Sequence, residues 1–329
     1  MALFFLVVGL EIKREVVRGE LRILRTSLLP IGAAIGGMIV PATIFLVFNY
    51  NQPENINGWA IPVATDIAFA LGVISLLGRR VPSSLKVFLL TIAVVDDIIA
   101  ILIIALFYGN GFDLMPLAAA GLIALGIFLS RNTRYLSLPL FAILGIAMWA
   151  AVYQSGIHAS ITGAFLGFLA PLAAYRNTSV AERLERYTIP IATFVVVPLF
   201  AFANLGIVLS INSVRGEGAM PLVWGIIGGL VLGKVVGITL ATWLLTKLKI
   251  SELPPNTTWL QIIGVGLIAG IGFTVSVFIT ELSFVGNQEL TDVAKLSIVI
   301  ASTICAVGGY AFLRYRKKVK TFLETEIEI

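Results

Sequence analysis

Long apolar stretches that contain a few isolated charges constrain the fold of this chain more than any other feature. One of them, TIAVVDDIIAILIIALFY, carries Asp96 and Asp97 side by side in an otherwise uncharged run. Of the whole sequence, 58% is hydrophobic and 12% is charged, whereas soluble domains have about 25% charged residues. The runs are continuous, unlike the short alternating strands of a membrane β-barrel. The chain is therefore expected to be an all-α, polytopic membrane protein.

The apolar stretches predict about eleven transmembrane segments in one transporter domain that covers residues 1–329. Segments of about 17–25 apolar residues can cross the hydrocarbon core as helices. The predicted segments lie near residues 1–18, 28–49, 60–78, 84–108, 114–130, 135–153, 155–174, 187–210, 220–246, 257–285 and 290–314.

Loops rich in lysine and arginine alternate with loops that contain almost none. The basic loops are Lys13–Arg25, Arg79–Lys86, Arg131–Arg134, Arg176–Arg186, Lys247–Lys249 and Arg314–Lys320. Basic loops stay on the cytoplasmic side of a membrane, so we expect these loops and the tail, residues 315–329, to be cytoplasmic. The net charge of +5 does not indicate nucleic-acid binding, because the basic residues lie in short loops, where they set the orientation of the chain in the bilayer. No nucleic-acid partner is expected.

The first apolar run, MALFFLVVGL, is too short to cross a bilayer by itself. It also lacks the basic region of a signal peptide. With eleven segments and a cytoplasmic C-terminus, residue 1 begins on the outer side. We therefore expect an N-terminal truncation or a late assigned start, with one helix missing before residue 1.

Two predicted segments look interrupted. Segment 60–78 contains Pro62, Thr65 and Asp66, and segment 257–285 contains four glycines, Gly264, Gly266, Gly270 and Gly272. Proline removes a backbone donor and glycine relaxes helix geometry, although glycines also serve close helix packing. Each interrupted segment is the middle one of a triple, approximately 28–108 and 220–314. Triples of opposite orientation with matching broken helices predict an inverted-repeat transporter with its site near the midplane.

Among the charged residues inside predicted segments, Asp66, Asp96, Asp97 and Lys234 carry the functional interpretation. Charges are costly at membrane depth and usually mark ion or proton pathways. Adjacent residues on a helix differ by about 100° in direction, so Asp96 and Asp97 cannot face the same way. Lys234 is the natural partner for an acid, because an unpaired buried ammonium is costly; snorkelling to water is the alternative.

Carboxylate and hydroxyl oxygens suit a hard cation such as Na⁺ or Li⁺. A carboxylate that binds either the cation or a proton couples the two flows, which favours a secondary antiporter. Three other classes stay open: a cation channel or uniporter with the same acidic pocket, an intramembrane enzyme, and a truncated, non-transporting fragment. The single histidine leaves few ligands for a catalytic metal, so no enzyme activity is expected.

Some charged residues carry weaker signals. The cluster of Glu11, Lys13, Arg14 and Glu15 fits a solvated helix end as well as a cation funnel or pH sensor. His158, the one histidine, favours a structural role over a pH-dependent one.

Eight motifs carry a resemblance to a known family. They are GLEIKREVVRGEL, IGGMIVPA, GWAIPVATDIAFALG, SSLKVFLLTIAVVDDIIAI, SGIHASITG, PLFAFANLGI, LGKVVGI and GIGFTVSVFI. In this order, and over nearly the whole chain, the sequence resembles the NhaA family of bacterial Na⁺/H⁺ antiporters.

The resemblance implies a twelve-helix transport fold with two crossed, interrupted helices. It implies electrogenic export of Na⁺ or Li⁺ in exchange for inward protons across the bacterial inner membrane, which regulates intracellular pH and sodium. Asp97 and Asp96 would bind the cation and the proton, and Lys234 would pair with Asp96. Thr65 and Asp66 would lie at the helix crossing. No cofactor is expected besides the transported ions.

The sequence departs from the family pattern in two regions. The first helix, the start of the second and the hairpin between them have no counterpart here; that hairpin supports dimerisation in the family, so a homodimer is weakened if it is truly absent. The pH-response region is matched at Glu11, Arg14, Glu15 and Glu185. Ala174 replaces an acidic residue, and Arg186 and Ile189 stand where some relatives have histidine, so the pH set point is expected to differ.

Overall fold

The computed structural model describes residues 1–109, 113–130, 137–172, 174–175, 178–204, 206 and 219–315. The predicted basic loop Arg131–Arg134, residues 207–218 and the tail from residue 316 onward lie outside the described residues. The helices, in chain order, are α1 (Ala2–Arg18), α2 (Leu24–Asn49), α3 (Ile67–Leu76), α4 (Ser83–Phe107), α5 (Leu114–Ser130), α6 (Leu138–Gln154), α7 (Ser160–Leu169), α8 (Val180–Ile191), α9 (Val197–Asn204), α11 (Ala219–Ile227), α12 (Lys234–Lys247), α13 (Trp259–Ala269), α14 (Phe273–Ser283) and α15 (Gln288–Arg314).

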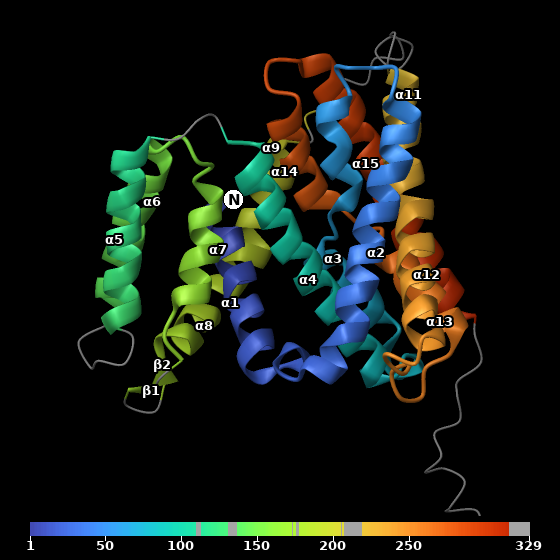
Figure 1. Cartoon of the computed structure of the whole chain (residues 1–329), viewed down its shortest axis with the longest axis horizontal. Coiled ribbons are helices and arrows are strands. Elements are labelled where there is room, and N and C mark those ends of the chain that lie inside the picture. Colours follow the sequence, from blue (N-terminus) through green and yellow to red (C-terminus); the bar gives the residue numbers. More distant parts are fainter. Residues whose placement is uncertain are drawn as a thin grey trace, which may run out of the picture. The chain divides into compact units, whose positions relative to one another are not determined.

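Short elements of other kinds join these helices (Figure 1). Three are 3-10 helices, Glu20–Arg22, Ile56–Val63 and Gly78–Arg80, and two are π-helical turns, Ala192–Val196 and Gly228–Gly233. The only strands among the described residues are β1 (Ala174–Tyr175) and β2 (Thr178–Ser179), which form an antiparallel pair. The predicted helical fold class is therefore confirmed, with this short hairpin as an addition.

Within the described residues, six helical stretches are long and apolar enough to cross a membrane, and the bent pair α13–α14 makes a seventh. The six are Thr26–Asn49, Ile56–Leu76, Ser83–Phe107, Val180–Asn204, Ala219–Lys247 and Gln288–Arg314. Helices α5, α6 and α7 are apolar but shorter. These helices make the chain a polytopic membrane protein.

Two predicted segments have boundaries that differ from those of the observed helices by five residues or more. The segment predicted from residue 187 begins earlier, at Val180, because Ser179 and Glu182 form a capping box: Glu182 N donates to Ser179 Oγ, and Ser179 N donates to Glu182 Oε2, each at 3.1 Å. The segment predicted over 155–174 is helical only over Ser160–Leu169.

The chain forms two compact units. The first comprises Met1–Gly19 and Ile98–Leu205, and the second comprises Glu20–Asp97 and Gly206–Ile329. In the first unit α1 packs on α7, and α5 packs on α6. Gly9 and Gly163 allow the close approach of α1 and α7, since a Cβ at either position would collide with the backbone of the other helix.

In the second unit, α2 packs along α12 (Figure 1). Gly36 and Gly237 face each other so closely that a Cβ on either glycine would overlap the carbonyl oxygen of the other. Small residues at a helix contact in a membrane protein let the backbones touch. This contact fixes α12, whose first residue is Lys234, against α2.

The second unit also contains both interrupted helices. The 3-10 helix Ile56–Val63 ends at Ala64, whose ψ of 148° is extended, and α3 begins after Asp66. Helices α13 and α14 are bent by 46° across the break between Ala269 and Phe273. Gly264 and Gly266, which the sequence suggested as part of the interruption, lie inside α13, and the break falls at residues 270–272.

Candidate functional site

The two interruptions contact each other. Asp66 N donates a hydrogen bond to Ile271 O at 2.6 Å, so the extended backbone of one break satisfies a carbonyl of the other. Irregular backbone at membrane depth is tolerated only where protein or a water-filled cavity satisfies its polar groups. Gly272 permits the approach, because a Cβ there would lie 3.1 Å from Ala64 O and would collide with Ser276 Oγ. Asp66 and Gly272 thus lie at one junction.

Asp66 links the first turns of two helices. Its Oδ1 accepts from Phe69 N at 3.2 Å and caps α3, and its Oδ2 accepts from Thr274 N at 3.0 Å and from Thr274 Oγ1. Asp66 is fully buried. Helix N-termini carry a partial positive charge of about +0.5, so one carboxylate offsets the N-terminal ends of α3 and α14 together.

Asp96 lies beside this junction and is paired with Lys234. Lys234 Nζ donates to Asp96 Oδ2 at 2.5 Å, with both side chains 0% exposed. Thr65 Oγ1 lies 2.8 Å from Asp96 Oδ2 and 2.8 Å from Ala269 O; its single proton can serve one of them at a time. The structure therefore brings Thr65, Asp96 and Lys234 together, in the pairing that the resemblance implies.

The local helix geometry brings Lys234 next to Asp96. The six residues before it, Gly228–Gly233, form a π-helical turn, a distortion that is frequent at functional sites. Gly229 and Gly233 bring this turn close to Pro62 and Pro41, since a Cβ on either glycine would lie 2.6–2.7 Å from the nearest proline atom. The turn therefore lets α12 start against the broken helix, with the lysine facing Asp96.

Two features make the aspartates candidates for ion binding. Asp96 Oδ1 is buried and has no hydrogen-bond partner within the described residues, although buried polar atoms are normally satisfied. Asp97, the next residue on α4, is 4% exposed. A buried carboxylate oxygen without a partner, next to a second buried carboxylate, can accept a proton or a cation.

The glycines of the second interruption, Gly270 and Gly272, cap its two half-helices: Gly270 follows α13 and Gly272 precedes α14. A Cβ at Gly270 would collide with Leu230 O and would lie 2.6 Å from Cys305 Sγ. Both positions are therefore closed to larger residues.

Three hydroxyl residues of the junction were not singled out from the sequence. Thr274 bonds Asp66, Ser276 Oγ donates to Ile61 O at 2.8 Å, and Ser302 Oγ accepts from Phe273 N at 3.2 Å. The available signal was the run FTVS directly after the glycines, because a hydroxyl in a first helical turn commonly bonds a nearby polar group.

The predicted pH-response residues lie in the first unit. Arg14, Glu15 and Glu185 are close enough to Glu11 to interact with it electrostatically. His158 is half-buried in the loop before α7, with its Nδ1 3.1 Å from Ser160 Oγ.

The substitution Thr274→Val should lower stability, because it removes one of the donors to the buried Asp66 carboxylate while preserving side-chain shape. A hydrogen bond to a charged group contributes about 1.5–3 kcal/mol. We expect a lower melting temperature for the purified protein. Thr303→Val is the matched control, because the exposed Thr303 bonds only within α15, to Val299 O. Equal melting temperatures for the two variants would contradict the role given to Thr274.

In the part of the chain that the structure describes, no group of three or more His, Cys, Asp or Glu residues is arranged to hold a metal ion. The ionisable groups that the described contacts bring to the junction are Asp96, the lysine that pairs with it, and Asp66 at the contact of the broken helices; Asp97 follows Asp96 on α4.

Comparison with known proteins places the whole chain in a family. The sequence model of a family described as Na⁺/H⁺ antiporter 1 matches residues 1–313. The chain is 47% identical to the Na⁺/H⁺ antiporter NhaA of Escherichia coli O1:K1, and equally to those of Salmonella arizonae and Salmonella typhimurium. Each match covers 96% of this chain and 81% of the relative. The chain belongs to the NhaA family of Na⁺/H⁺ antiporters.

Proposed function

We propose that this chain exports Na⁺ or Li⁺ from a bacterial cell in exchange for inward protons, with Asp97 and Asp96 as the shared binding site. The observation that carries the proposal is the state of Asp96. One of its oxygens is paired with Lys234 and Thr65, and the other is buried without a hydrogen-bond partner among the residues that the structure describes. The two aspartates would supply carboxylate oxygens to the cation, and hydroxyl, backbone or water oxygens would complete its shell.

Coupling follows from competition for the same oxygens. A carboxylate that holds a proton cannot bind Na⁺ well, and a bound Na⁺ disfavours the proton. One Na⁺ needs the charge of both carboxylates, whereas each carboxylate can carry its own proton. Exchange of one Na⁺ for more than one proton moves net charge, so transport is electrogenic.

The contact of the two interruptions supports a crossing of broken helices at the site, and the triples near 28–108 and 220–314 would be its inverted repeats. The six long stretches, the bent pair, the three shorter apolar helices and α1 would together make eleven segments among the described residues. The basic loops orient the C-terminus toward the cytoplasm, and the membrane is the inner membrane. A homodimer is proposed only if the dimerisation hairpin of the family has a counterpart here, and cross-linking in membranes would detect it.

A pH response is proposed for the first unit. Glu11 interacts electrostatically with one base, Arg14, and with two acids, Glu15 and Glu185. A change in the protonation of one acid therefore alters the electric field at the others. His158 is proposed as a further contributor to the pH response, so its replacement by alanine should shift the pH profile of exchange.

The function is tested in everted membrane vesicles that contain the 329-residue chain. After respiration acidifies the vesicle lumen, added Na⁺ or Li⁺ should collapse the pH gradient, and vesicles without the chain should keep it. Clamping the membrane potential with K⁺ and valinomycin should change the initial rate, because net charge moves. A channel with the same pocket would carry ²²Na⁺ without moving protons, and that outcome would refute antiport.

A further inference from the structure

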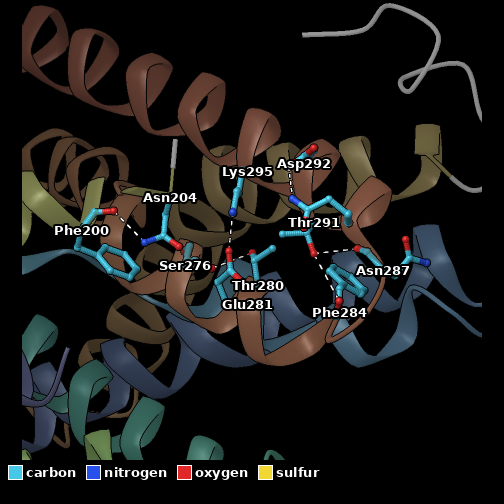
Figure 2. A network of polar contacts seen from close by, with 11 residues as sticks. Phe200, Asn204, Ser276, Thr280, Glu281, Phe284, Asn287, Thr291, Asp292 and Lys295 are labelled. Carbon is cyan, nitrogen blue, oxygen red and sulfur yellow. Dashed lines mark hydrogen bonds and ion pairs between the residues drawn. The ribbon is translucent and has the colours of Figure 1, made fainter. Parts of the chain in front are cut away.

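The half-helix α14 is held against α15 at both of its ends. At the inner end, Phe273 N donates to Ser302 Oγ at 3.2 Å. At the other end, Lys295 Nζ lies 2.5 Å from Glu281 Oε1, and Figure 2 shows the two side chains pointing at each other. The two contacts are separated by about 10–12 Å along each helix, at 1.5 Å per residue. They fix the axial register of two antiparallel helices.

The contact between Lys295 and Glu281 is not what helix packing alone would require. The side chain of Lys295 is only 7% exposed, whereas that of Glu281 is 39% exposed. A buried ammonium is costly unless a partner compensates it, and apolar residues can often replace such a pair without loss of stability. An ion pair requires one register of the two helices, while apolar side chains tolerate sliding. The geometry therefore fits a register-setting role.

The register of α14 matters because its first turn holds the junction. Thr274 donates to Asp66, and Ser276 Oγ donates to Ile61 O at 2.8 Å. Thr65, which precedes Asp66, contacts Asp96 at 2.8 Å. A chain of direct contacts thus runs from α14 to the aspartate that is paired with Lys234.

We propose that Glu281 and Lys295 form a positioning pair for the transport site. By fixing α14 on α15, the pair keeps the donors of Thr274 on Asp66 and thereby keeps Thr65 against Asp96. Neither residue binds the transported ion. The inference rests on the proposed function for its kinetic consequence, but its structural consequence at Thr274 can be measured without transport.

The first experiment measures hydrogen–deuterium exchange of the peptide that contains Thr274 in the detergent-purified chain. Lys295→Met and Glu281→Gln should each raise its exchange rate at least about threefold, since amide exchange reports local opening. The charge-swapped double variant, Glu281→Lys with Lys295→Glu, should restore slow exchange. Asp292→Asn is the matched control, because it removes a charge from the same end of α15, where Asp292 bonds Gln288 at 2.9 Å and not the pair.

The second experiment measures the KM for Na⁺ in vesicles. Both single variants should raise KM at least about threefold with kcat within about twofold, equivalent to a change of about 0.65 kcal/mol in apparent affinity. The swapped variant should return KM to the unmutated value. If Lys295→Met does not fold, Glu281→Gln decides, since it keeps a polar partner for the lysine.

The outcomes separate the two proposals. Unchanged exchange at Thr274 in both single variants would overturn the positioning role, whether or not the chain transports. A lower melting temperature with unchanged exchange at Thr274 and unchanged KM would also overturn it, because the pair would then be only structural. Faster exchange at Thr274, with swap rescue, in a chain that shows no Na⁺-driven proton movement would support the positioning role and count against the proposed function.

Discussion

Asp97→Asn is expected to abolish Na⁺-driven proton movement, lowering its initial rate at least about 100-fold, or about 2.7 kcal/mol. Asparagine nearly preserves the shape of this buried side chain. It carries no charge for Na⁺ and has no proton to release at physiological pH. Both halves of the exchange therefore fail together. The measurement is the Na⁺-induced collapse of the pH gradient in everted vesicles, at equal amounts of protein.

Asp113→Asn provides the control for this substitution. Asp113 is exposed at the start of α5, where its Oδ1 accepts from Met115 N at 3.0 Å. Asparagine can accept the same hydrogen bond, so this variant changes charge alone at a position outside the site. Exchange should remain within about twofold of the unmutated rate. Normal Na⁺-driven proton movement in the Asp97→Asn variant would contradict the mechanism in which Na⁺ and protons share one site.

Lys234→Ala is expected to have the largest effect on stability. The variant leaves Asp96 buried without its ion-pair partner, and breaking a buried pair from one side typically costs about 3–5 kcal/mol. The melting temperature of the purified protein should fall markedly, and the pH profile of exchange should shift because Asp96 loses the charge that favours its ionised form.

A double variant tests whether the pair causes these effects. Lys234→Ala combined with Asp96→Asn removes both charges, so part of the lost stability should return, as expected for coupled residues. Lys247→Ala, at the exposed end of the same helix, should change little. An unchanged melting temperature and pH profile in Lys234→Ala would count against the ion pair.

The sequence allowed much of this site to be predicted, because charges and helix breakers are conspicuous in an apolar chain. Pro62 and Asp66 marked one interruption, and Gly270 and Gly272 marked the other. The cost of an unpaired ammonium named Lys234 as the partner of an acid, and the structure places it on Asp96. These predictions rest on the chemistry of single residues inside apolar segments, which can be recognised without knowing any tertiary contact.

The rest depended on tertiary contacts. Thr274 is one of many hydroxyls in the chain, and only the approach of α14 to Asp66 distinguishes it. The π-helical turn before Lys234 packs against Pro41 and Pro62, and no local sequence pattern indicates this contact. Gly264 and Gly266 looked like helix breakers but serve packing inside α13, since a Cβ at Gly266 would lie 2.9 Å from Val235 Cα.

The contact between Gly36 and Gly237 has a consequence for how the transporter can move. Backbones that touch without intervening side chains have no rotamers to absorb a displacement, so we expect α2 and α12 to travel as one rigid body. Lys234 then cannot change its depth by a slide of α12 alone. Any step of the transport cycle that separates it from Asp96 must move α4 or the broken helices instead, and leave the two glycines in register.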